Sequence, residues 1–322
     1  MADDFSELTN VLKNCLNEIK RVMVGQDEAI RHAVASCIAG GHVLLEDVPG
    51  TGKTTLASTL AHVLGLTFNR IQGTPDLLPS DIIGTSVYLP ATGEFVFRPG
   101  PIFTQLLLVD EVNRATPRTQ SALLEAMAER QISSEGKTHA LDDVFFVIAT
   151  ANPLESQGVF PLPEAQIDRF LVQLKLGYGS EEEELQMIER IRLSDKVQPT
   201  PQLTKAQILE IRSMCKQITV SKDIARYIVQ LCRATRHHES ILLGASPRSV
   251  LLLTAFSQSL ALMSGRNYVI PDDVKEAWFP VMRHRIRLHV EWMADDPSGD
   301  SQHVLTEILQ SVKTPGEHFI EV

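Results

Sequence analysis

The fold of this chain is decided by one stretch, Val43-Leu44-Leu45-Glu46-Asp47-Val48-Pro49-Gly50-Thr51-Gly52-Lys53-Thr54-Thr55. An apolar run is followed by a glycine-rich turn, and a helical pattern begins directly after that turn. This order predicts a phosphate-binding loop from Pro49 to Thr54. Gly50 and Gly52 allow the backbone to curl until several N–H groups point at one spot. That concavity and the positive end of the helix together bind a polyphosphate.

The loop assigns roles to particular side chains. Lys53 is placed to reach the β- and γ-phosphates of a nucleotide, and Thr54 to bind Mg²⁺ through its hydroxyl. The residues expected to hold the nucleotide in this loop are Pro49, Gly50, Thr51, Gly52, Lys53, Thr54 and Thr55. The pattern G-x-x-x-x-G-K-[ST] asks for glycine where the chain has Asp47, which also suits a turn. A chance glycine-rich turn between strand and helix is the alternative.

Length and composition are those of an ordinary globular protein. The chain has 322 residues, which favours about two domains, and 43% of them are hydrophobic, enough for sizeable cores. No apolar run reaches the roughly 18 residues of a membrane span. The acidic N-terminus, residues 1–5, does not begin a signal peptide, so we expect a cytoplasmic location. The net charge of −10 argues against broad nucleic-acid binding.

Cysteine usage points away from disulfides and metal sites. The chain has 4 cysteines without C-x-x-C spacing, and each falls among apolar positions. We therefore expect buried free thiols at Cys15, Cys37, Cys215 and Cys232.

The first half of the chain alternates between strand and helix patterns. Apolar runs predict strands at 42–45, 67–71, 105–109, 144–150 and 171–174. Helical spacing predicts helices at 5–22, 27–38, 54–64 and 117–130. This alternation predicts an α/β fold, a doubly wound five-stranded parallel sheet with right-handed crossovers. Asp47, Asp110 and Asn152 would then gather at the carboxyl edge of the sheet, where such folds bind ligands.

Two hairpins are expected beside this sheet. Strand patterns at 86–89 and 94–97 flank the turn Pro90-Ala91-Thr92-Gly93, and this hairpin would project from the body. A second hairpin-like stretch covers 131–143, around Glu135-Gly136-Lys137.

The composition shifts to helical patterns after Gly177-Tyr178-Gly179-Ser180. An acidic turn at 181–184 suits a helix start, and further helices are predicted at 204–215, 222–236, 247–263 and 271–281. Ser221 and Ser246 are predicted N-caps, with Pro247 at the first helical position. We therefore expect a nucleotide-binding domain at 1–178 and a smaller all-helical domain at 179–322.

A second signature ends the strand at 105–109. There Asp110 is expected to hold Mg²⁺, directly or through water, and Glu111 to polarise the attacking water. Asn152 ends the next strand, where its amide would orient the same water. Its Asn-Pro dipeptide suits a turn equally well.

Taken together, these motifs resemble AAA+ ATPases and, within them, the MoxR family. The resembling stretches are Val24-Gly25-Gln26, Glu46–Thr54, Gly73–Asp81, Gly93–Phe95, Arg98–Pro101, Asp110–Ala115, Gln120–Met127, Ala149–Pro153 and Leu162–Phe170. The second half matches more loosely, mainly at Gly244–Arg248. The resemblance implies a P-loop sheet domain followed by a helical lid. Lys53 and Thr54 would belong to Walker A, Asp110 and Glu111 to Walker B, and Asn152 would be sensor 1.

The resemblance also implies roles for three arginines. Arg169 would be the arginine finger that reaches the nucleotide of the neighbouring subunit. Arg248 would be sensor 2 at the start of a lid helix, through which ATP bridges the sheet domain and the lid. Arg114 is a further candidate for the subunit interface. A surface ion pair is the alternative for each of them.

Other positions take their roles from the same resemblance. Val24 and Gly25 would lie against the adenine. The two hairpins would be the helix-2 insert and the pre-sensor hairpin of this AAA+ branch. Phe95 and Phe97 would contact a client protein or pack the hairpin base.

The function implied by the family is ATP hydrolysis, with ATP and Mg²⁺ as cofactors, in a homo-oligomeric ring expected to be a hexamer. The ring would remodel or mature a client protein or complex, together with a partner that bears a von Willebrand factor A domain. Two other functions stay open. One is a DNA-directed AAA+ motor of the helicase type, against which the acidic balance and the lack of an appended DNA-binding domain count. The other is a nucleotide-gated scaffold with little turnover, against which the complete catalytic set counts. The basic run Arg283 to Arg287 is interpreted as a solvated or interface face.

Overall fold

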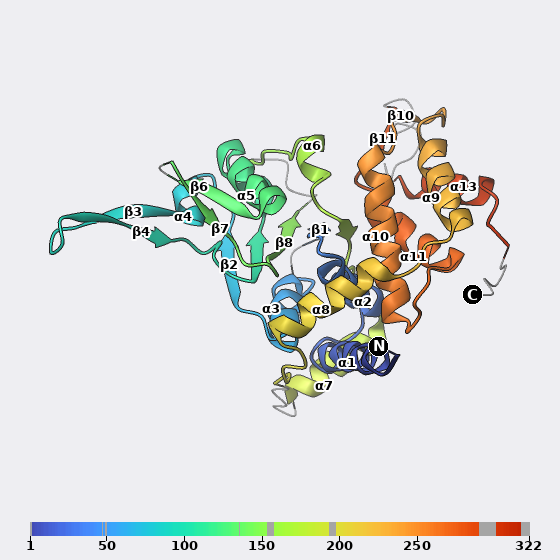
Figure 1. Cartoon of the computed structure of the whole chain (residues 1–322), viewed down its shortest axis with the longest axis horizontal. Coiled ribbons are helices and arrows are strands. Elements are labelled where there is room, and N and C mark those ends of the chain that lie inside the picture. The colour runs from blue at the N-terminus through green and yellow to red at the C-terminus, as the bar shows by residue number, and fades with distance from the viewer. Residues whose placement is uncertain are drawn as a thin grey trace.

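A five-stranded parallel sheet forms the centre of the first half of the chain, as predicted (Figure 1). Its strands are β1 (Val43–Glu46), β2 (Phe68–Gln72), β5 (Leu106–Asp110), β8 (Phe146–Ala151) and β9 (Val172–Leu174), in the order β2-β5-β8-β1-β9. The structure is a computed structural model. It describes residues 2–46, 48, 50–134, 136–152, 158–192, 198–289 and 301–316.

The sheet is buried on both faces, which explains why its strands read as continuous apolar runs. Along β5, Leu106 and Leu108 belong to the core shared with α1 (Ala2–Val22), α2 (Asp27–Ala39) and α3 (Lys53–Val63). The alternate residues, Leu107 and Val109, belong to the core under α5 (Pro117–Glu129). The period of two along a strand thus assigns its residues to the two cores.

The parallel register aligns the ends of the strands. Gln72 is the partner of Asp110, and Glu46 is the partner of Ala151. The loop after β1, the Asp110-Glu111 pair after β5 and Asn152 after β8 therefore leave the sheet at one edge. The short helices α4 (Pro79–Ile83) and α6 (Glu164–Ile167) and a 3₁₀ turn (Val112–Arg114) lie in the connections.

Both predicted hairpins are present. In the first, β3 (Gly84–Leu89) pairs antiparallel with β4 (Glu94–Pro99) and projects far from the sheet (Figure 1). In the second, β6 (Gln131–Ser134) pairs with β7 (Lys137–Ala140). The ring of Phe97 stacks on His139 of β7 with 4.1 Å between centroids, whereas Phe95 is 72% exposed. Phe97 therefore packs at the hairpin base, and Phe95 is left at the surface.

The second half of the chain is mainly helical, as predicted. Its helices are α7 (Glu181–Arg192), α8 (Lys205–Gln217), α9 (Lys222–Thr235), α10 (Pro247–Met263), α11 (Pro271–Met282) and α13 (Gln302–Ser311). Ser221 and Ser246 are the N-caps that the sequence predicts, since their hydroxyls accept from the N–H groups of Ile224 and Ser249. One feature was not predicted. A short antiparallel pair joins β10 (Ile241–Leu243) to β11 (Arg287–Leu288), and strands this short show no readable periodicity.

The lid packs on α2 of the sheet domain. Arg31 of α2 pairs with Glu276 of α11 at 2.8 Å. The buried Arg212 of α8 donates to the carbonyl oxygens of Cys37 and Asp143, each at 2.9 Å. The domain boundary expected at residue 178 stays a prediction.

All four cysteines are free and buried, as predicted. Burial raises the pKa of the Cys15, Cys215 and Cys232 thiols to about 12, so these groups are unreactive near neutral pH. Within the described residues, none of the helices combines the length and the apolar character that crossing a bilayer requires.

His42, just before β1, is a buried neutral histidine. Its Nε2–H donates to the Met127 carbonyl oxygen at 3.2 Å, and its Nδ1 accepts from the Val147 N–H at 3.0 Å. Burial lowers the pKa of the imidazole from 6.5 to about 4. The ring therefore serves as a fixed hydrogen-bonding link between β8 and α5.

We expect His42 to make the protein less stable as the pH falls from 6.5 toward 4. In this range the unfolded chain binds a proton at His42 that the folded chain excludes, which costs about 2 kcal/mol at pH 5. His42→Gln keeps a donor and an acceptor but does not titrate. Its free energy of unfolding in urea should therefore differ less between pH 7 and pH 5 than that of the wild type. The control is His303→Gln on α13, an exposed position. An equal pH dependence in all three proteins would contradict the assignment.

Candidate nucleotide-binding site

The loop after β1 has the geometry that its glycines predict. Gly50 and Gly52 have φ values of 87° and 90°, in the region that favours glycine. Gly52 is the N-cap of α3, and Lys53 is its first residue. The Lys53 ammonium donates to the Val48 carbonyl oxygen at 2.9 Å, across the loop. Asp47 and Pro49 lie outside the described residues.

The other residues that the sequence assigns to nucleotide binding in this loop are partly accessible to solvent. Thr51, Gly52, Lys53 and Thr54 are half-buried, and Thr55 is exposed. The loop and the N-terminal turn of α3 therefore present backbone N–H groups, a positive helix end and an ammonium together. This arrangement binds phosphate groups.

Asp110 is a buried carboxylate, 6% exposed, that pairs with an arginine. Arg70 of β2 donates from Nε to Asp110 Oδ2 at 2.6 Å. The hydroxyl of Thr150 donates to Asp110 Oδ1 at 3.4 Å and accepts from the Glu111 N–H at 2.8 Å. A cation that binds Asp110 therefore has to compete with the Arg70 guanidinium.

Glu111 is held by partners from two directions. Its Oε2 accepts from Gln72 Nε2 and from Arg114 Nη1, each at 3.0 Å. Its backbone has φ 53°, an unusual value for a residue other than glycine that is often found at functional sites. Arg114 therefore makes an ion pair within its own chain. Such an ion pair was the alternative to a role at the subunit interface.

Gly73 allows β2 to end against the backbone of Asp110 and Glu111. Its N–H donates to the Asp110 carbonyl oxygen at 2.7 Å. A Cβ at this position would lie 2.2 Å from the Glu111 carbonyl oxygen, far inside van der Waals contact. A glycine is needed here to bring Gln72 next to Glu111.

Asn152 follows β8 and is buried beside this cluster. Its carbonyl oxygen accepts from Asn113 Nδ2 at 3.4 Å. Asp110, Glu111 and Asn152 therefore leave the sheet at the same edge as the phosphate-binding loop, as the alternating pattern predicts. Their catalytic roles stay predictions.

The turn at Val24-Gly25-Gln26 lies next to the loop. Gly25 and Gln26 have φ values of 74° and 61°, and Gln26 Nε2 donates to the Thr51 carbonyl oxygen at 3.3 Å. The Glu183 carboxylate packs so closely on Gly25 that a Cβ there would lie 2.4 Å from it. The turn is thus fixed to the phosphate loop on one side and to α7 on the other.

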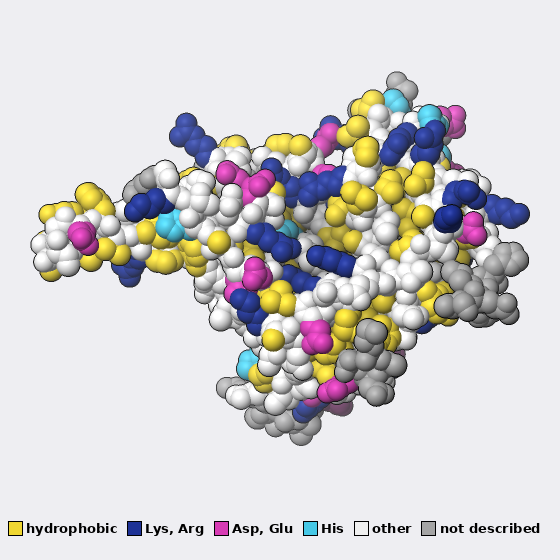
Figure 2. All heavy atoms as spheres, in the orientation of Figure 1, with side chains coloured by type: hydrophobic (Ala, Val, Ile, Leu, Met, Phe, Trp, Pro, Cys, Tyr) yellow, Lys and Arg dark blue, Asp and Glu magenta, His cyan; other side chains and the backbone are white. Residues whose placement is uncertain are grey.

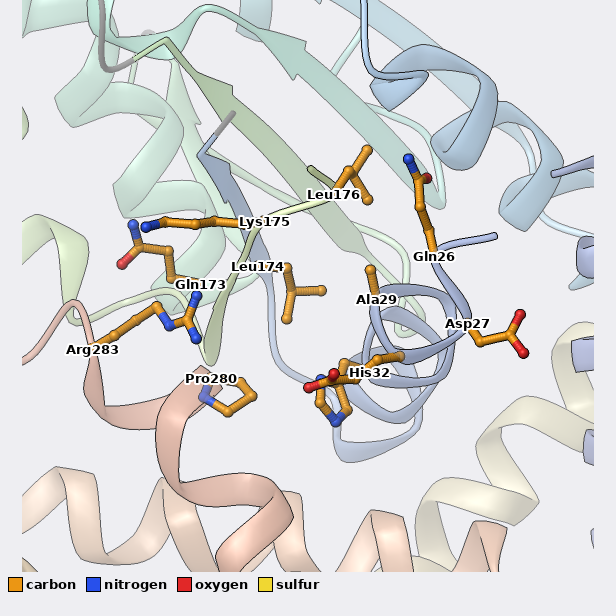
Figure 3. Close-up of a pocket in the computed structure, with 11 residues that line it drawn as sticks. Gln26, Asp27, Ala29, His32, Gln173, Leu174, Lys175, Leu176, Pro280 and Arg283 are labelled. Atoms are coloured by element: carbon orange, nitrogen blue, oxygen red, sulfur yellow. The ribbon is translucent and has the colours of Figure 1, made fainter. Parts of the chain in front are cut away.

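A cavity of about 300 Å³ opens beside this turn, between the start of α2, the end of β9 and the end of α11. Figure 3 shows Gln26 and Leu176 on one side and Pro280 and Arg283 on the other. The cavity is lined by Gln26, Asp27, Glu28, Ala29, His32, Gln173, Leu174, Lys175, Leu176, Pro280 and Arg283. Its lining is more polar than apolar, with Ala29, Leu174, Leu176 and Pro280 among charged and polar side chains.

The side chains near the loop fit a magnesium ion that is shared with phosphates. Mg²⁺ prefers oxygen ligands, and the Thr54 hydroxyl and the Asp110 carboxylate provide them. In the part of the chain that the structure describes, no three His, Cys, Asp or Glu side chains group into a metal site. The donor set therefore suits an ion that takes its remaining ligands from a nucleotide and water.

Arg169 and Arg248 lie at the other edge of the sheet. The Leu171 N–H donates to the His42 carbonyl oxygen at 2.8 Å, which places the segment 168–171 where the strands begin. Arg169 donates from Nη1 to the Leu124 carbonyl oxygen of α5. Arg248, in the first turn of α10, lies with Nε 4.0 Å from Asp168 Oδ2, and its side chain is 51% exposed.

Arg248 was expected to join ATP to the lid, and in this structure its side chain lies beside Asp168 at the strand-start edge, opposite the phosphate loop. Its role toward the nucleotide stays a prediction. The loop residues, Asp110, Glu111 and Asn152 come together, whereas Arg169 and Arg248 do not join them.

The basic run at 283–287 is also not a solvated face throughout. The Arg285 side chain is 2% exposed and pairs with Asp168, and His284 Nε2 donates to the Phe170 carbonyl oxygen at 3.2 Å. This run forms a contact between the lid and the sheet domain. Sequence reasoning also missed Arg70, Gln72 and Thr150. Aligning the predicted strands in parallel register, which places Gln72 opposite Asp110, could have identified Arg70 and Gln72.

Comparison with known proteins follows the same division of the chain. Residues 42–172 match the ATPase family associated with various cellular activities (AAA), and residues 233–308 match the AAA lid domain. The chain is 41% identical to the chaperone MoxR1 of Mycobacterium tuberculosis over 98% of this chain and 85% of that protein. It is 43% identical to the uncharacterized protein YeaC of Bacillus subtilis, over 96% of each chain. A crystal structure of a candidate ATPase from Cytophaga hutchinsonii superposes with a TM-score of 0.90 at 38% identity, over 98% of both chains.

Replacing Arg70 with leucine should make the stability of the protein depend on Mg²⁺. Without the guanidinium the buried Asp110 carboxylate lacks its cation, and a divalent ion can compensate the charge. We expect a lower melting temperature in EDTA than for the wild type. Added MgCl₂ should then raise it by roughly 2–4 °C, while the wild type changes little. Arg226→Leu, which removes an exposed arginine of α9, is the control. The same Mg²⁺ response in the wild type and Arg70→Leu would disprove the competition.

Proposed function

Because the chain belongs to the MoxR family of AAA+ ATPases, we propose that it binds and hydrolyses Mg·ATP in a ring of identical subunits, expected to be a hexamer. The cycle would drive chaperone-like remodelling or maturation of a client protein or complex. Similarity to the chaperone MoxR1 and the geometry of the loop support this proposal. The four buried free thiols support a location in the reducing cytoplasm.

Phosphoryl transfer would take place at the strand-end edge of the sheet. The loop and Lys53 would hold the phosphates, and Thr54 and Asp110 would hold the metal, which neutralises charge on the transferred phosphoryl group. Glu111 would polarise the attacking water, and Asn152 would orient it. Arg70 would have to leave Asp110 before the metal binds there. Glu111 would likewise have to exchange Gln72 and Arg114 for the water.

The adenine would lie by the turn that is fixed to the phosphate loop. Val24 and Gly25 are the proposed contacts. The cavity beside Gln26 supports this place for the base, because it offers space next to that turn, with Ala29 and Leu174 as apolar contacts among polar groups (Figure 3).

The observation that supports a ring is that the proposed catalytic groups are divided between the two edges of the sheet. Phosphoryl transfer spreads negative charge that a guanidinium stabilises, yet Arg169 and Arg248 lie at the edge opposite the phosphate loop. In a head-to-tail ring the strand-start edge of one subunit would face the strand-end edge of the next. Each site would then receive Arg169, and with it Arg248, from the neighbouring chain.

The surface around Arg248 supports a contact with a neighbour. Leu251 lies one turn further along α10 and is 70% exposed, and Leu243 of β10 is 45% exposed. Figure 2 shows hydrophobic side chains gathered on this face of α10 and β10. Apolar residues around an arginine are typical of the core of a protein interface.

The β3–β4 hairpin is the proposed contact with the client. Large apolar side chains are exposed along it, namely Val87, Tyr88, Leu89, Phe95 and Val96 (Figure 2). Such a surface suits partly unfolded or apolar segments of another protein. The family also suggests a partner with a von Willebrand factor A domain, and the client stays unidentified. A DNA motor is less well supported, since the net charge is −10 and Arg285 of the basic run is buried.

Lys53→Ala should weaken ATP binding. The ammonium is expected to make a charge-assisted hydrogen bond to the phosphates, so its loss should raise the dissociation constant about 10- to 100-fold. Titration with a fluorescent ATP analogue measures this. Lys222→Ala is the matched control, because Lys222 also begins a helix, α9, after an N-cap but without a glycine loop. Unchanged affinity in Lys53→Ala would refute the loop assignment.

Mixing two inactive variants should restore ATPase activity. Arg169→Ala should lose about 10³-fold or more in turnover, and Glu111→Gln should bind ATP without turning it over. At equal mixing, about one subunit contact in four pairs an intact Glu111 with an intact Arg169 from the neighbour, so about a quarter of wild-type activity should return. Mixed rings, verified by differently tagged subunits, that remain inactive would rule out a finger acting between subunits.

A further inference from the structure

The backbone on both sides of Arg169 is held by one buried side chain of the lid. Arg285 lies three residues after the end of α11, and its side chain is 2% exposed. Its guanidinium crosses from the lid into the turn that connects α6 to β9.

The contacts of Arg285 surround residue 169 without touching it. Nε donates to Asp168 Oδ1 at 2.8 Å, and Nη2 donates to the Asp168 carbonyl oxygen at 3.3 Å and to that of Phe170. Nη1 donates to the Leu171 carbonyl oxygen at 3.0 Å and to that of Val281 in α11. The neighbouring His284 adds a second hydrogen bond to the Phe170 carbonyl oxygen.

These bonds restrict the direction in which the Arg169 side chain leaves the backbone. The carbonyl of residue 168 lies in the peptide plane just before residue 169, and that of residue 170 lies in the plane just after residue 170, so fixing both restricts the backbone dihedral angles of the pair 169–170. A planar guanidinium with five donors can hold several acceptors at once, which an ammonium cannot do in the same geometry.

The Asp168 carboxylate is shared between two lid arginines. Oδ1 accepts from Arg285, and Oδ2 lies 4.0 Å from Arg248 Nε. Burial lowers the pKa of Arg285 to about 10, and the nearby Asp168 opposes this shift, so the guanidinium stays charged at neutral pH. Asp168, the residue before Arg169, is therefore linked to the lid of its own chain through both Arg285 and Arg248.

We propose that Arg285 is a positioning residue for Arg169: through Asp168 and the carbonyls at 168, 170 and 171, the lid of each subunit aims that subunit's arginine finger at the neighbouring site. The inference rests on the proposed role of Arg169. A displacement of about 1 Å in such a group costs roughly 100-fold in rate, so a small change in this contact changes hydrolysis in the next subunit. The position of one lid thereby sets the activity of the adjacent site.

The test uses two variants. Arg285→Lys keeps the buried positive charge but loses the planar guanidinium with its several donors. Asp168→Asn keeps the shape of the side chain but removes the negative charge that pairs with Arg285. Each should lower ATPase roughly 10- to 100-fold and leave the dissociation constant for ATP within about twofold of the wild type. If Arg285→Lys fails to fold by circular dichroism, Asp168→Asn carries the same test. Arg287→Ala is the matched control. It removes an exposed arginine two residues away that pairs with Glu164 of α6, and it should keep wild-type activity.

Mixed rings separate positioning from a general loss of structure. Arg285→Lys mixed with Glu111→Gln should regain activity, because the Glu111→Gln subunit supplies a correctly held finger to an intact site. Arg285→Lys mixed with Arg169→Ala should not rise above the residual activity of Arg285→Lys, because neither subunit supplies a correctly held finger. The reverse pattern, or wild-type ATPase in both variants, would overturn the proposal.

If Arg169→Ala and Glu111→Gln themselves fail to complement, the finger assignment in the proposed function is wrong. If they complement while Arg285→Lys does not complement Glu111→Gln, only the positioning role is wrong.

Discussion

The parallel register of the sheet is the constraint on which the rest of the structure depends. Backbone hydrogen bonds hold Gln72 opposite Asp110 and Glu46 opposite Ala151, so the strands end together. All groups that follow strands must then meet at one edge, and all groups that precede strands meet at the other. The phosphate loop belongs to the first edge and Arg169 to the second. No rotation of side chains can move a residue from one edge to the other.

The strand-end edge concentrates negative charge, and the chain compensates it with its own side chains. Asp110 is buried and pairs with Arg70, while Glu111 accepts hydrogen bonds from Gln72 and Arg114. A buried carboxylate without a partner would destabilise the fold, so these contacts hold the site together until other partners replace them. The groups that stabilise the sheet at this edge are thus the ones that catalysis has to displace.

Local sequence signals predicted the elements, and long-range contacts escaped them. The continuous apolar run at 105–109 identified a strand buried on both faces, and Ser246-Pro247 marked the start of α10 to the residue. Arg285 gave no such signal. Its partner Asp168 is 117 residues away, so the sequence did not reveal that one arginine of this basic run is buried. The position of Arg248 beside Asp168 likewise depends on how the lid packs on α2, which no periodicity encodes.

The separation of the two edges makes assembly a condition for rapid hydrolysis in the proposed ring. An isolated chain can hold the nucleotide at its strand-end edge, but the guanidinium groups that would stabilise the transferred phosphoryl group lie at its other edge. Since Arg285 connects that second edge to the lid, the position of the lid and the proposed finger at Arg169 would be joined through a buried ion pair. The Arg285 side chain of this ion pair is only 2% exposed, so dissolved salt screens the pair little. The contact between Arg285 and Asp168 should therefore persist at ionic strengths that weaken surface ion pairs. Communication around the ring would then depend on the packing of lid on sheet rather than on charges at the surface.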